Sequence, residues 1–451
     1  MQQLDLTQGS IVRNIFSFSL PYMLAYFLQT LYGLADLFII GQYCGVEETT
    51  AVSNGAQVMH MFTCIIIGLA MGSTVHIARA TGARDRAGAA RVVGNSATMF
   101  LLLSVVATVV LLFLIGNIIG IMRTLAEAVE STRHYLTICF LGIPFIVAYN
   151  IIASIYRGLG DSRTPMRFVA VACAANVLLD YLFIGALGLG AAGAALGTVL
   201  SQMTSVAYAF LAIRKHREAI ACTRNDFRPH RRTMANILKI GFPIALQNGF
   251  IQVSFVVIAI IANMRGLNDA AAVGIVEKII GLLFIVPSAM LSTVSAITAQ
   301  NIGARNPQRA ASTLRYSLFI TATFGIFVSL ILQFLPEGAV RIFTDDATVA
   351  ALGGEYLRSY VWDCPLAGIH FCFSGYFTAY GFASISFIHN FLSIILARLP
   401  LSYCLSIAFP ATLFPMGWAS PAGSCLSATI CITLFFWMKR RGKFLKGLVA
   451  E

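Results

Sequence analysis

The chain has 451 residues, of which 58% are hydrophobic and only 11% are charged, and its formal net charge is +12. Soluble domains carry about a quarter charged residues, so this composition excludes an ordinary soluble protein. Apolar stretches long enough to cross a bilayer, roughly 20 residues each, recur from Ile15 to Trp437. They lack the ~10-residue alternation of an outer-membrane barrel. We therefore expect an all-α integral membrane protein, with the lipid bilayer as its surroundings.

Hydropathy predicts about twelve spans. In chain order they cover residues 14–40, 50–77, 92–115, 134–155, 166–186, 191–212, 236–262, 270–297, 312–335, 353–378, 384–407 and 413–438. Most of the 31 Lys and Arg fall in alternate connections, whereas the opposite connections hold only Arg123, Arg133, Arg265, Arg341 and Arg358. Because cytoplasmic loops carry the basic excess, we expect both termini in the cytoplasm. We expect a multi-pass protein of the plasma membrane, here a prokaryotic inner membrane. The basic charge reflects this topology and does not indicate binding to nucleic acid.

An internal repeat relates the two halves at a separation of 221 residues. Residues 82–84 (Gly-Ala-Arg) align with 303–305, Pro144 with Pro365 and Gly160 with Gly381. A fixed separation indicates duplication. An even number of spans in each half predicts parallel repeats around a central cavity. We expect two pseudo-symmetric six-helix lobes, 1–213 and 236–451, joined by a basic cytoplasmic linker, 214–235.

The ten cysteines and seven histidines are scattered along the chain. No C-x-x-C pair or zinc-ligand spacing occurs among them. We therefore expect no disulfide framework, no metal site and no cofactor.

Carboxylates within the apolar spans are the main functional candidates, because ionisable groups are costly in a bilayer. Asp36 lies in the first span and Asp180 in the fifth, and Asn176 shares a helical face with Asp180. If both aspartates face one cavity, desolvation and mutual repulsion favour protonation, so the pair could carry a proton. Na⁺ suits the same oxygen ligands. Alternatively, each aspartate could be a helix-end group that reaches water.

The second half offers further candidates, for substrate binding: Glu277, His370 and Tyr376. Glu277 could contact a cation, but snorkelling or a partly wet interface explains it about as well. Aromatic residues at helical spacing are more often core than cavity lining. Asp363 lies only at the mouth of the tenth span, and Arg398 is expected to extend its charged end to the membrane surface.

Taken in order, these features resemble the multidrug and toxic compound extrusion (MATE) family over essentially the whole chain. The resemblance rests on Pro21 in the first helix, Asp36 ahead of Ile40-Gly41, the two Gly-Ala-Arg loops, and the segments 156–165 and 190–198. It implies an alternating-access antiporter that exports organic cations or amphipathic drugs and toxins in exchange for H⁺ or Na⁺.

Within the family, the chain is similar to the DinF-like branch, whose amino-terminal lobe carries a polar cation site. The resemblance assigns cation coupling to Asp36, Asp180, Asn176, Asn150, Thr198 and Tyr135. The NorM branch instead places acidic groups in helices seven and ten. In this chain the seventh helix holds no acidic residue, and the tenth holds only Asp363. A proline inside a helix marks a point of bending, so Pro21 is the expected hinge, with a fixed packing kink as the alternative.

Two other functions compete with drug export. A flippase for lipid-linked oligosaccharides would need several cations inside its cavity, and the spans offer little beyond Lys278 and Arg398. An intramembrane enzyme would need a nucleophile with a base or a metal cluster, which the sequence does not supply. We expect a non-enzymatic transporter, monomeric, with a small-molecule drug or toxin and a coupling cation as its partners.

Overall fold

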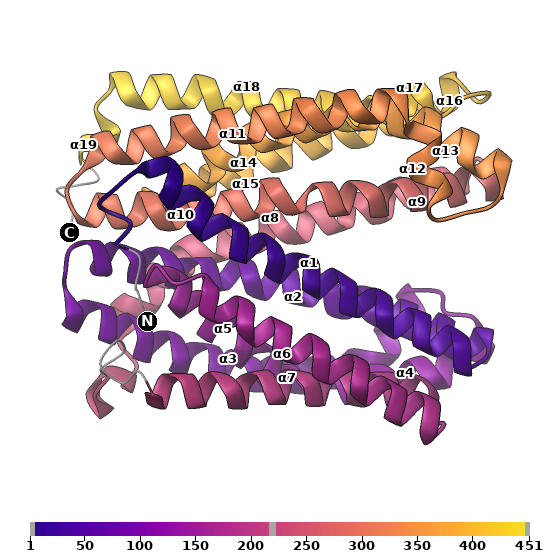
Figure 1. Ribbon diagram of the computed structural model, residues 1–451, viewed down its shortest axis with the longest axis horizontal. Helices are drawn as coiled ribbons and strands as arrows, with labels where there is room; N and C mark the ends of the chain where they lie inside the picture. The colour runs from indigo at the N-terminus through magenta and orange to yellow at the C-terminus, as the bar shows by residue number, and fades with distance from the viewer. Residues whose placement is uncertain (1–4, 216–221, 447–451) are drawn as a thin grey trace. The chain divides into compact units, whose positions relative to one another are not determined.

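The computed structural model describes residues 5–215 and 222–446, and every regular element in those ranges is helical (Figure 1). Among the described residues, ten helical segments are long and apolar enough to cross a membrane, and a pair bent by 48° makes an eleventh. The remaining expected span corresponds to α13 (Ala347–Tyr360) and α14 (Asp363–Ala379), which meet at a short break. The predicted all-α membrane fold is therefore confirmed.

The spans of the first half are α1 (Ile11–Tyr43), α2 (Val46–Gly82), α3 (Arg86–Ile121), the bent pair α4 (Val129–Leu141) and α5 (Ile143–Gly158), α6 (Arg163–Asp180) with η2 (Tyr181–Ala186), and α7 (Gly190–Lys215). Those of the second half, besides α13 and α14, are α8 (Arg231–Asn263), α9 (Leu267–Leu283) with α10 (Ile285–Gly303), α11 (Pro307–Phe334), α15 (Ala383–Ser393) with η5 (Ile394–Arg398) and α16 (Leu399–Ala408), and α17 (Phe414–Gly417) with α18 (Ala419–Arg440). The short elements are η1 (Ala126–Ala128), η4 (Arg224–Phe227), α12 (Pro336–Arg341) and α19 (Lys443–Lys446).

The described helices form two compact units. The first unit contains Leu20–Leu238, and the second joins Asp5–Ser19 to the described residues from Lys239 on. The boundaries between the units therefore fall inside α1 and α8. Residues 216–221 of the linker expected at 214–235 lie outside the described residues.

The rest of the linker packs against α3 of the first unit. Asn95 donates from its side-chain amide to the carbonyl of Asp226 at 3.1 Å and accepts from the backbone N–H of His230 at 2.7 Å. The Thr98 hydroxyl donates to the carbonyl of Phe227 at 2.8 Å. A Cβ on Gly94 would lie only 2.3 Å from the Asp226 carbonyl oxygen, so glycine permits this approach. The linker residues around η4 are consequently docked.

The amino-terminal segment Asp5–Ser19 is anchored within the second unit. Arg309 on α11 donates to the carbonyls of Gly9 and Gln8, each at 2.8 Å. Asn301 on α10 donates to the carbonyl of Leu6 at 3.3 Å, and the Leu6 side chain is fully buried. These contacts hold the segment that leads into α1 to helices that follow about 300 residues later in the chain.

The repeat predicted from the sequence reappears in the backbone. Arg84 and Arg305 both adopt a left-handed conformation, with φ of 57° and 56°, and Gly160 and Gly381 have φ of 89° and 83°. The helices after the arginines begin at matching caps, since Asp85 accepts from the N–H of Gly88 and Asn306 accepts from that of Arg309. Positive φ is uncommon outside glycine, so equal values at aligned arginines support duplication.

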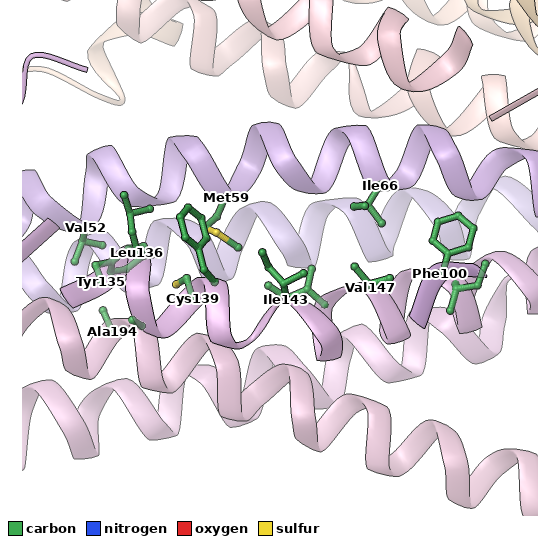
Figure 2. Packing of buried hydrophobic residues seen from close by; sticks show 14 of the residues in the cluster. Val52, Met59, Ile66, Phe100, Tyr135, Leu136, Cys139, Ile143, Val147 and Ala194 are labelled. Atoms are coloured by element: carbon green, nitrogen blue, oxygen red, sulfur yellow. The ribbon is translucent and has the colours of Figure 1, made fainter. Parts of the chain in front are cut away.

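The core of the first unit follows from the spacing of its apolar residues (Figure 2). On α2, Val52, Met59 and Ile66 recur every seven residues and so share one face. On α4 and α5, buried residues recur every four: Tyr135, Cys139, Ile143 and Val147. Helix α2 packs against both α4 and α5, so these two faces meet and fix the bent pair on which Tyr135 is carried.

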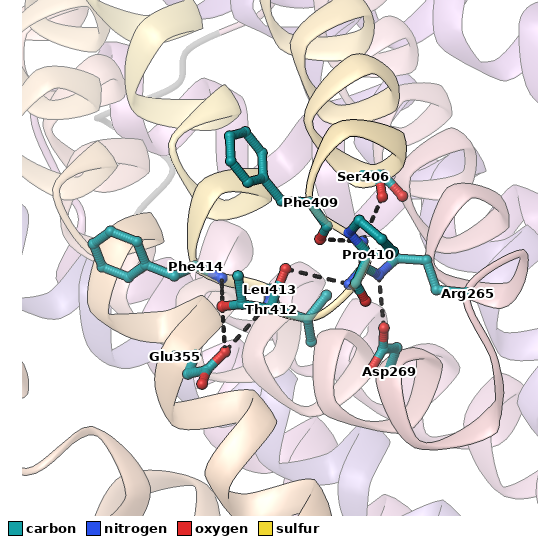
Figure 3. A network of polar contacts seen from close by, with 9 residues as sticks. All are labelled: Arg265, Asp269, Glu355, Ser406, Phe409, Pro410, Thr412, Leu413 and Phe414. Atoms are coloured by element: carbon teal, nitrogen blue, oxygen red, sulfur yellow. Dashed lines mark hydrogen bonds and ion pairs between the residues drawn. The ribbon is translucent and has the colours of Figure 1, made fainter.

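An arginine links three helices of the second unit through hydrogen bonds to the turn before α17 (Figure 3). Arg265, between α8 and α9, forms an ion pair with Asp269 at 2.6 Å. Its guanidinium also donates to four backbone carbonyls at the end of α16 and in the turn that leads to α17, those of Ser406, Phe409, Pro410 and Thr412, at 2.6 to 3.2 Å. Glu355 accepts from the Thr412 hydroxyl at 2.6 Å and so holds the same turn from α13.

Candidate functional site

Asp36 and Asp180 lie close together inside the first unit. Asp36 on α1 is 6% exposed, and Asp180, the last residue of α6, is fully buried. Their carboxyl groups interact electrostatically with each other. The hydroxyl of Thr198 on α7 donates to Asp36 Oδ2 at 3.4 Å. Three helices thus bring polar groups to one place, and neither aspartate is exposed at the surface of the described chain.

Several polar atoms of this cluster have no hydrogen-bond partner in the described chain. They are Asp36 Oδ1, both carboxyl oxygens of Asp180 and both amide atoms of Asn176. Asn176 is 1% exposed, lies beside Asp36 and is on the same helical face as Asp180, as its spacing predicts. Leaving a buried polar group unsatisfied costs about 1–3 kcal/mol. Each such group in a buried place calls for an explanation, which a bound water, ion or proton could supply.

Local structure explains how Asp180 fits there. Helix α6 widens directly after Asp180 into the π-helical turn η2, and such turns occur frequently at functional sites. On α7, which packs against α6, a Cβ on residue 197 would lie 2.1 Å from Asp180 Oδ1. Because residue 197 is glycine, the carboxyl group can lie against the backbone of α7.

Tyrosine side chains from two helices extend the cluster. Tyr135 on α4 is 2% exposed and interacts electrostatically with Asp36, as does the half-buried Tyr32 of α1. Tyr32 also contacts Gln202 of α7, which is 7% exposed. Tyr32 and Gln202 were not among the predicted site residues. Helical spacing could have found them, because Tyr32 precedes Asp36 by four residues and Gln202 follows Thr198 by four.

Asn150 is the one predicted cation-site residue that is not found to contact the Asp36–Asp180 cluster. Its side chain on α5 is 4% exposed, and its amide donates to the carbonyl of Ile146 in the same helix at 2.8 Å. The structure therefore gives Asn150 a hydrogen bond within α5, whereas Asp36, Asp180, Asn176, Thr198 and Tyr135 come together.

Pro21 lies inside α1, one residue beyond the boundary between Ser19 and Leu20 at which the two units divide. Close to it, the ring of Tyr22 packs under the guanidinium of Arg157 at 5.0 Å. The proline thus occurs where the helix leaves the second unit and begins to pack with the first. Pro243 occupies a similar place in α8, five residues after Leu238.

The three candidate substrate residues of the second unit do not form one group. Glu277 and His370 both interact electrostatically with Arg398. Tyr376 is instead part of an aromatic cluster with Tyr380, Phe435 and Phe444, at ring-centroid distances of 4.9 to 5.7 Å. Glu277 and His370 therefore share a location that Tyr376 does not.

The expectation that Arg398 extends to the membrane surface was wrong. Arg398 is 9% exposed and ends the π-helical turn η5. Its guanidinium donates to the Tyr360 hydroxyl at 2.6 Å and lies over the ring of Phe255 at 4.8 Å. The widened turn directs the side chain inward, a geometry that a regular helical reading of the sequence could not anticipate.

The described residues contain no group of three or more His, Cys, Asp or Glu side chains placed to hold a metal ion. All ten cysteines are free thiols.

Comparisons with known proteins agree with this architecture. The MatE family model matches residues 21–182 and again 243–404. The two matches begin at Pro21 and Pro243, so the duplication seen in the backbone also separates two copies of the family domain.

Individual relatives cover nearly the whole chain. The "Probable multidrug resistance protein YpnP" of Bacillus subtilis (strain 168) is 26% identical over 446 residues, with 99% of each chain covered. A "FAD transporter" of Shewanella oneidensis is 27% identical over 435 residues, which cover 92% of this chain and 94% of the relative. Among solved structures, the "Outward-facing conformation of a multidrug resistance MATE family transporter of the MOP superfamily" matches with a TM-score of 0.91 and 25% identity, over 99% of both chains.

Proposed function

We propose, from the premise that this chain belongs to the MatE family of multi-pass membrane transporters, that it exchanges protons for organic cations or amphipathic toxins. Family membership makes it a multidrug-efflux transporter that needs no cofactor, and not an enzyme. We also propose that the protein is a monomer of two six-helix lobes. It would lie in the inner membrane with both termini in the cytoplasm.

The observation that carries the proposal is the Asp36–Asp180 pair. Two carboxyl groups that interact inside a low-dielectric region cannot both ionise without strong repulsion, so a shared proton stabilises the pair. The pair then titrates as one unit. Asn176, Thr198 and Tyr135 supply the polar groups around it, in keeping with a place in the DinF-like branch.

Sodium is the alternative coupling ion. The carboxyl, amide and hydroxyl oxygens of this cluster are hard ligands that also suit Na⁺. We favour the proton because a shared proton relieves the repulsion between the two carboxyl groups without requiring further ligands.

Pro21 is the proposed hinge that links the pair to export. A proline removes one backbone hydrogen bond and allows a helix to bend. Asp36 is fifteen residues beyond Pro21, a little over 20 Å along the helix axis at ~1.5 Å per residue. Protonation at Asp36 therefore acts through the packing of α1, and it shifts the equilibrium only if the two shapes of α1 differ in proton affinity.

The names of the relatives support a broad substrate class, since they include multidrug resistance proteins and an FAD transporter. We propose organic cations or amphipathic compounds as substrates. Glu277 and His370 are proposed to contact the substrate. Tyr376 is a third proposed contact, at a different location in the second unit. Export of a flavin nucleotide or of a lipid-linked oligosaccharide is the competing outcome.

Transport into proteoliposomes tests the proposal. A fluorescent organic cation should move uphill when a pH gradient of the right polarity is imposed, and a Na⁺ gradient alone should have no effect. The Asp36→Asn and Asp180→Asn variants should lose uphill transport, while Asp345→Asn, which removes an exposed carboxyl group in the loop before α13, should retain it. Wild-type rates in both site variants would overturn the site assignment. Transport driven only by Na⁺ would replace the proton as the coupling ion.

A further inference from the structure

The end of the last span carries a group of positive charges that the proposed transport cycle does not use. Lys439 and Arg440 end α18, Arg441 and Lys443 follow them, and all four side chains are exposed. Residues 364–450 contain no Asp or Glu. Within the described ranges, none of the four basic side chains forms an ion pair with an acidic one. The group therefore has no acidic counterpart on its own part of the chain.

Two of these charges meet on one aromatic ring. The Arg441 guanidinium lies 4.6 Å from the centroid of the Trp437 ring, and the Lys443 ammonium lies 4.5 Å from it. The ring attracts each cation, but the two cations repel each other. An anion that binds both would relieve this repulsion through charge-assisted hydrogen bonds. The arrangement thus indicates a negatively charged ligand.

The backbone brings the two cations together. Gly442 has a left-handed conformation with φ of 63°, which glycine adopts without strain. Its N–H donates to the carbonyl of Lys439, and the N–H of Arg441 donates to that of Trp437, each at 3.1 Å. The chain turns at Gly442, so that Lys443 comes back to the ring of Trp437.

Phe444 anchors α19 to the second unit. Its side chain is buried, and its ring packs against those of Tyr376, Tyr380 and Phe435 at centroid distances of 4.9 to 5.6 Å. Adjacent residues of a helix point in different directions, so the inward Phe444 leaves Lys443 exposed. The position of Lys443 is therefore fixed by the packing of its neighbour.

The exposed face of α18 leads from apolar side chains to these charges. Ile432, Phe436 and Arg440 recur every four residues and are all exposed, so they share one face of the helix. Cys431 and Met438, on another face, are buried. A ligand along the exposed face meets apolar side chains beside the span and positive charge where the span ends. A phospholipid has this distribution of acyl chains and phosphate.

We propose that Trp437, Arg441 and Lys443 bind the head group of an anionic phospholipid. Its acyl chains lie along Ile432 and Phe436. The planar guanidinium donates to phosphate oxygens, and the ammonium adds a second positive charge. Tryptophan is enriched where hydrocarbon meets the head groups, which suits a ring at the level of the phosphate. The site shares no residue with the buried aspartate pair of the first unit and does not depend on its coupling role.

Quenching of Trp437 fluorescence by brominated lipids tests the proposal. The chain has three tryptophans, so Trp362→Phe/Trp418→Phe leaves Trp437 as the only one in the full-length protein. This protein is reconstituted into phosphatidylcholine vesicles with a minor fraction of brominated phosphatidylglycerol or of brominated phosphatidylcholine. Phosphatidylglycerol should bind at Trp437 about tenfold more tightly, because each Lys or Arg at the membrane surface attracts anionic lipid.

Variants in this background separate a defined site from general surface charge. Arg441→Gln/Lys443→Gln should abolish the preference for the anionic lipid, whereas the charge-preserving Arg441→Lys/Lys443→Arg should retain most of it. The matched control is Arg224→Gln/Arg228→Gln, which removes two exposed basic residues of the linker and should leave the preference unchanged. Phe444→Ala keeps every charge but releases α19 from the aromatic cluster, and should lower the preference severalfold.

Several results would overturn the proposal. It fails if the two brominated lipids quench Trp437 equally, or if Arg441→Gln/Lys443→Gln keeps the preference. It also fails if the linker control loses the preference to the same extent. An unchanged preference in Phe444→Ala would show that the charges act without a defined binding site. Loss of the preference on adding inorganic phosphate at constant ionic strength would assign the site to a soluble anion in place of a lipid.

Discussion

Gly197 of α7 lies directly against Asp180 of α6, so closely that a Cβ at position 197 would fall 2.1 Å from the carboxyl oxygen Oδ1. The absence of one side chain thus creates the space for the buried acid of the first unit. We expect Gly197→Ala to displace Asp180 from Asp36 and reduce proton-driven export about tenfold or more, because each ~1.4 kcal/mol of lost interaction changes binding tenfold. Uptake of a fluorescent cation by proteoliposomes measures this.

The matched control for that change is Gly116→Ala in α3, where a Cβ meets no atom within 4 Å. It adds the same methyl group to a helix without touching the site, and alanine is favoured over glycine in a helix interior. Equal activity of the two variants would show that Asp180 does not need its present position.

The hinge prediction concerns α1. Spin labels at Phe16→Cys and Phe38→Cys, both exposed positions on α1, span Pro21 in a background whose native cysteines are replaced by serine. Their separation should change with pH in the wild-type background, because protonation of the aspartate pair alters the packing of the helix. The change should disappear in Asp36→Asn/Asp180→Asn and diminish in Pro21→Ala. A separation that ignores pH in every background would leave Pro21 as a fixed kink.

Removal of the Arg265 side chain should destabilise the second unit. Arg265→Ala leaves Asp269 without its ion-pair partner and four backbone carbonyls without a donor. Leaving enclosed polar groups without a partner costs about 1–3 kcal/mol, so the thermal unfolding midpoint should fall clearly in detergent. Arg265→Lys keeps the charge but loses the planar set of donors. Its unfolding midpoint should lie between those of the wild type and Arg265→Ala. An unchanged unfolding midpoint in Arg265→Ala would show that the hydrogen bonds of Arg265 do not stabilise the second unit.

Docking of the linker should depend on pH through Asp226. Its carboxylate accepts from the backbone N–H and the hydroxyl of Thr223, each at 2.7 Å, and these hydrogen bonds lower the pKa of Asp226 below its usual value. A lowered carboxyl pKa stabilises the docked form above the ordinary pKa, and this contribution is lost as the pH falls through the lowered value.

Hydrogen exchange of the amides around η4, corrected for intrinsic pH effects, measures this docking. Protection should be present at neutral pH and decrease in acid. Asp226→Asn should exchange faster than wild type already at neutral pH, and trypsin should then cut more readily at the exposed Arg224. Protection that is equal in wild type and Asp226→Asn at all pH values would exclude a role for the carboxylate.

The sequence by itself determined the membrane class, the duplication and most of the first site. Long apolar stretches can satisfy their backbone hydrogen bonds in a bilayer only as helices or closed barrels, so the spans could be read directly. Asn176 and Asp180 share a face because four residues make about one helical turn. Asp36 and Asp180 stood out as carboxylates within apolar spans. The family motif added Thr198 and Tyr135 from two other helices, which no local spacing relates to one another.

Only the tertiary structure decided the features that depend on helix geometry or on distant packing. Arg398 turns inward because a π-helical turn rotates the chain there, and hydropathy carries no signal for that rotation. Tyr376 separates from His370 because α14 places them six residues apart along its axis, at two different levels of the unit. Asp5–Ser19 packs with the second unit because Arg309 and Asn301 bind its carbonyls, and contacts between residues 300 apart in the chain leave no local pattern in the sequence.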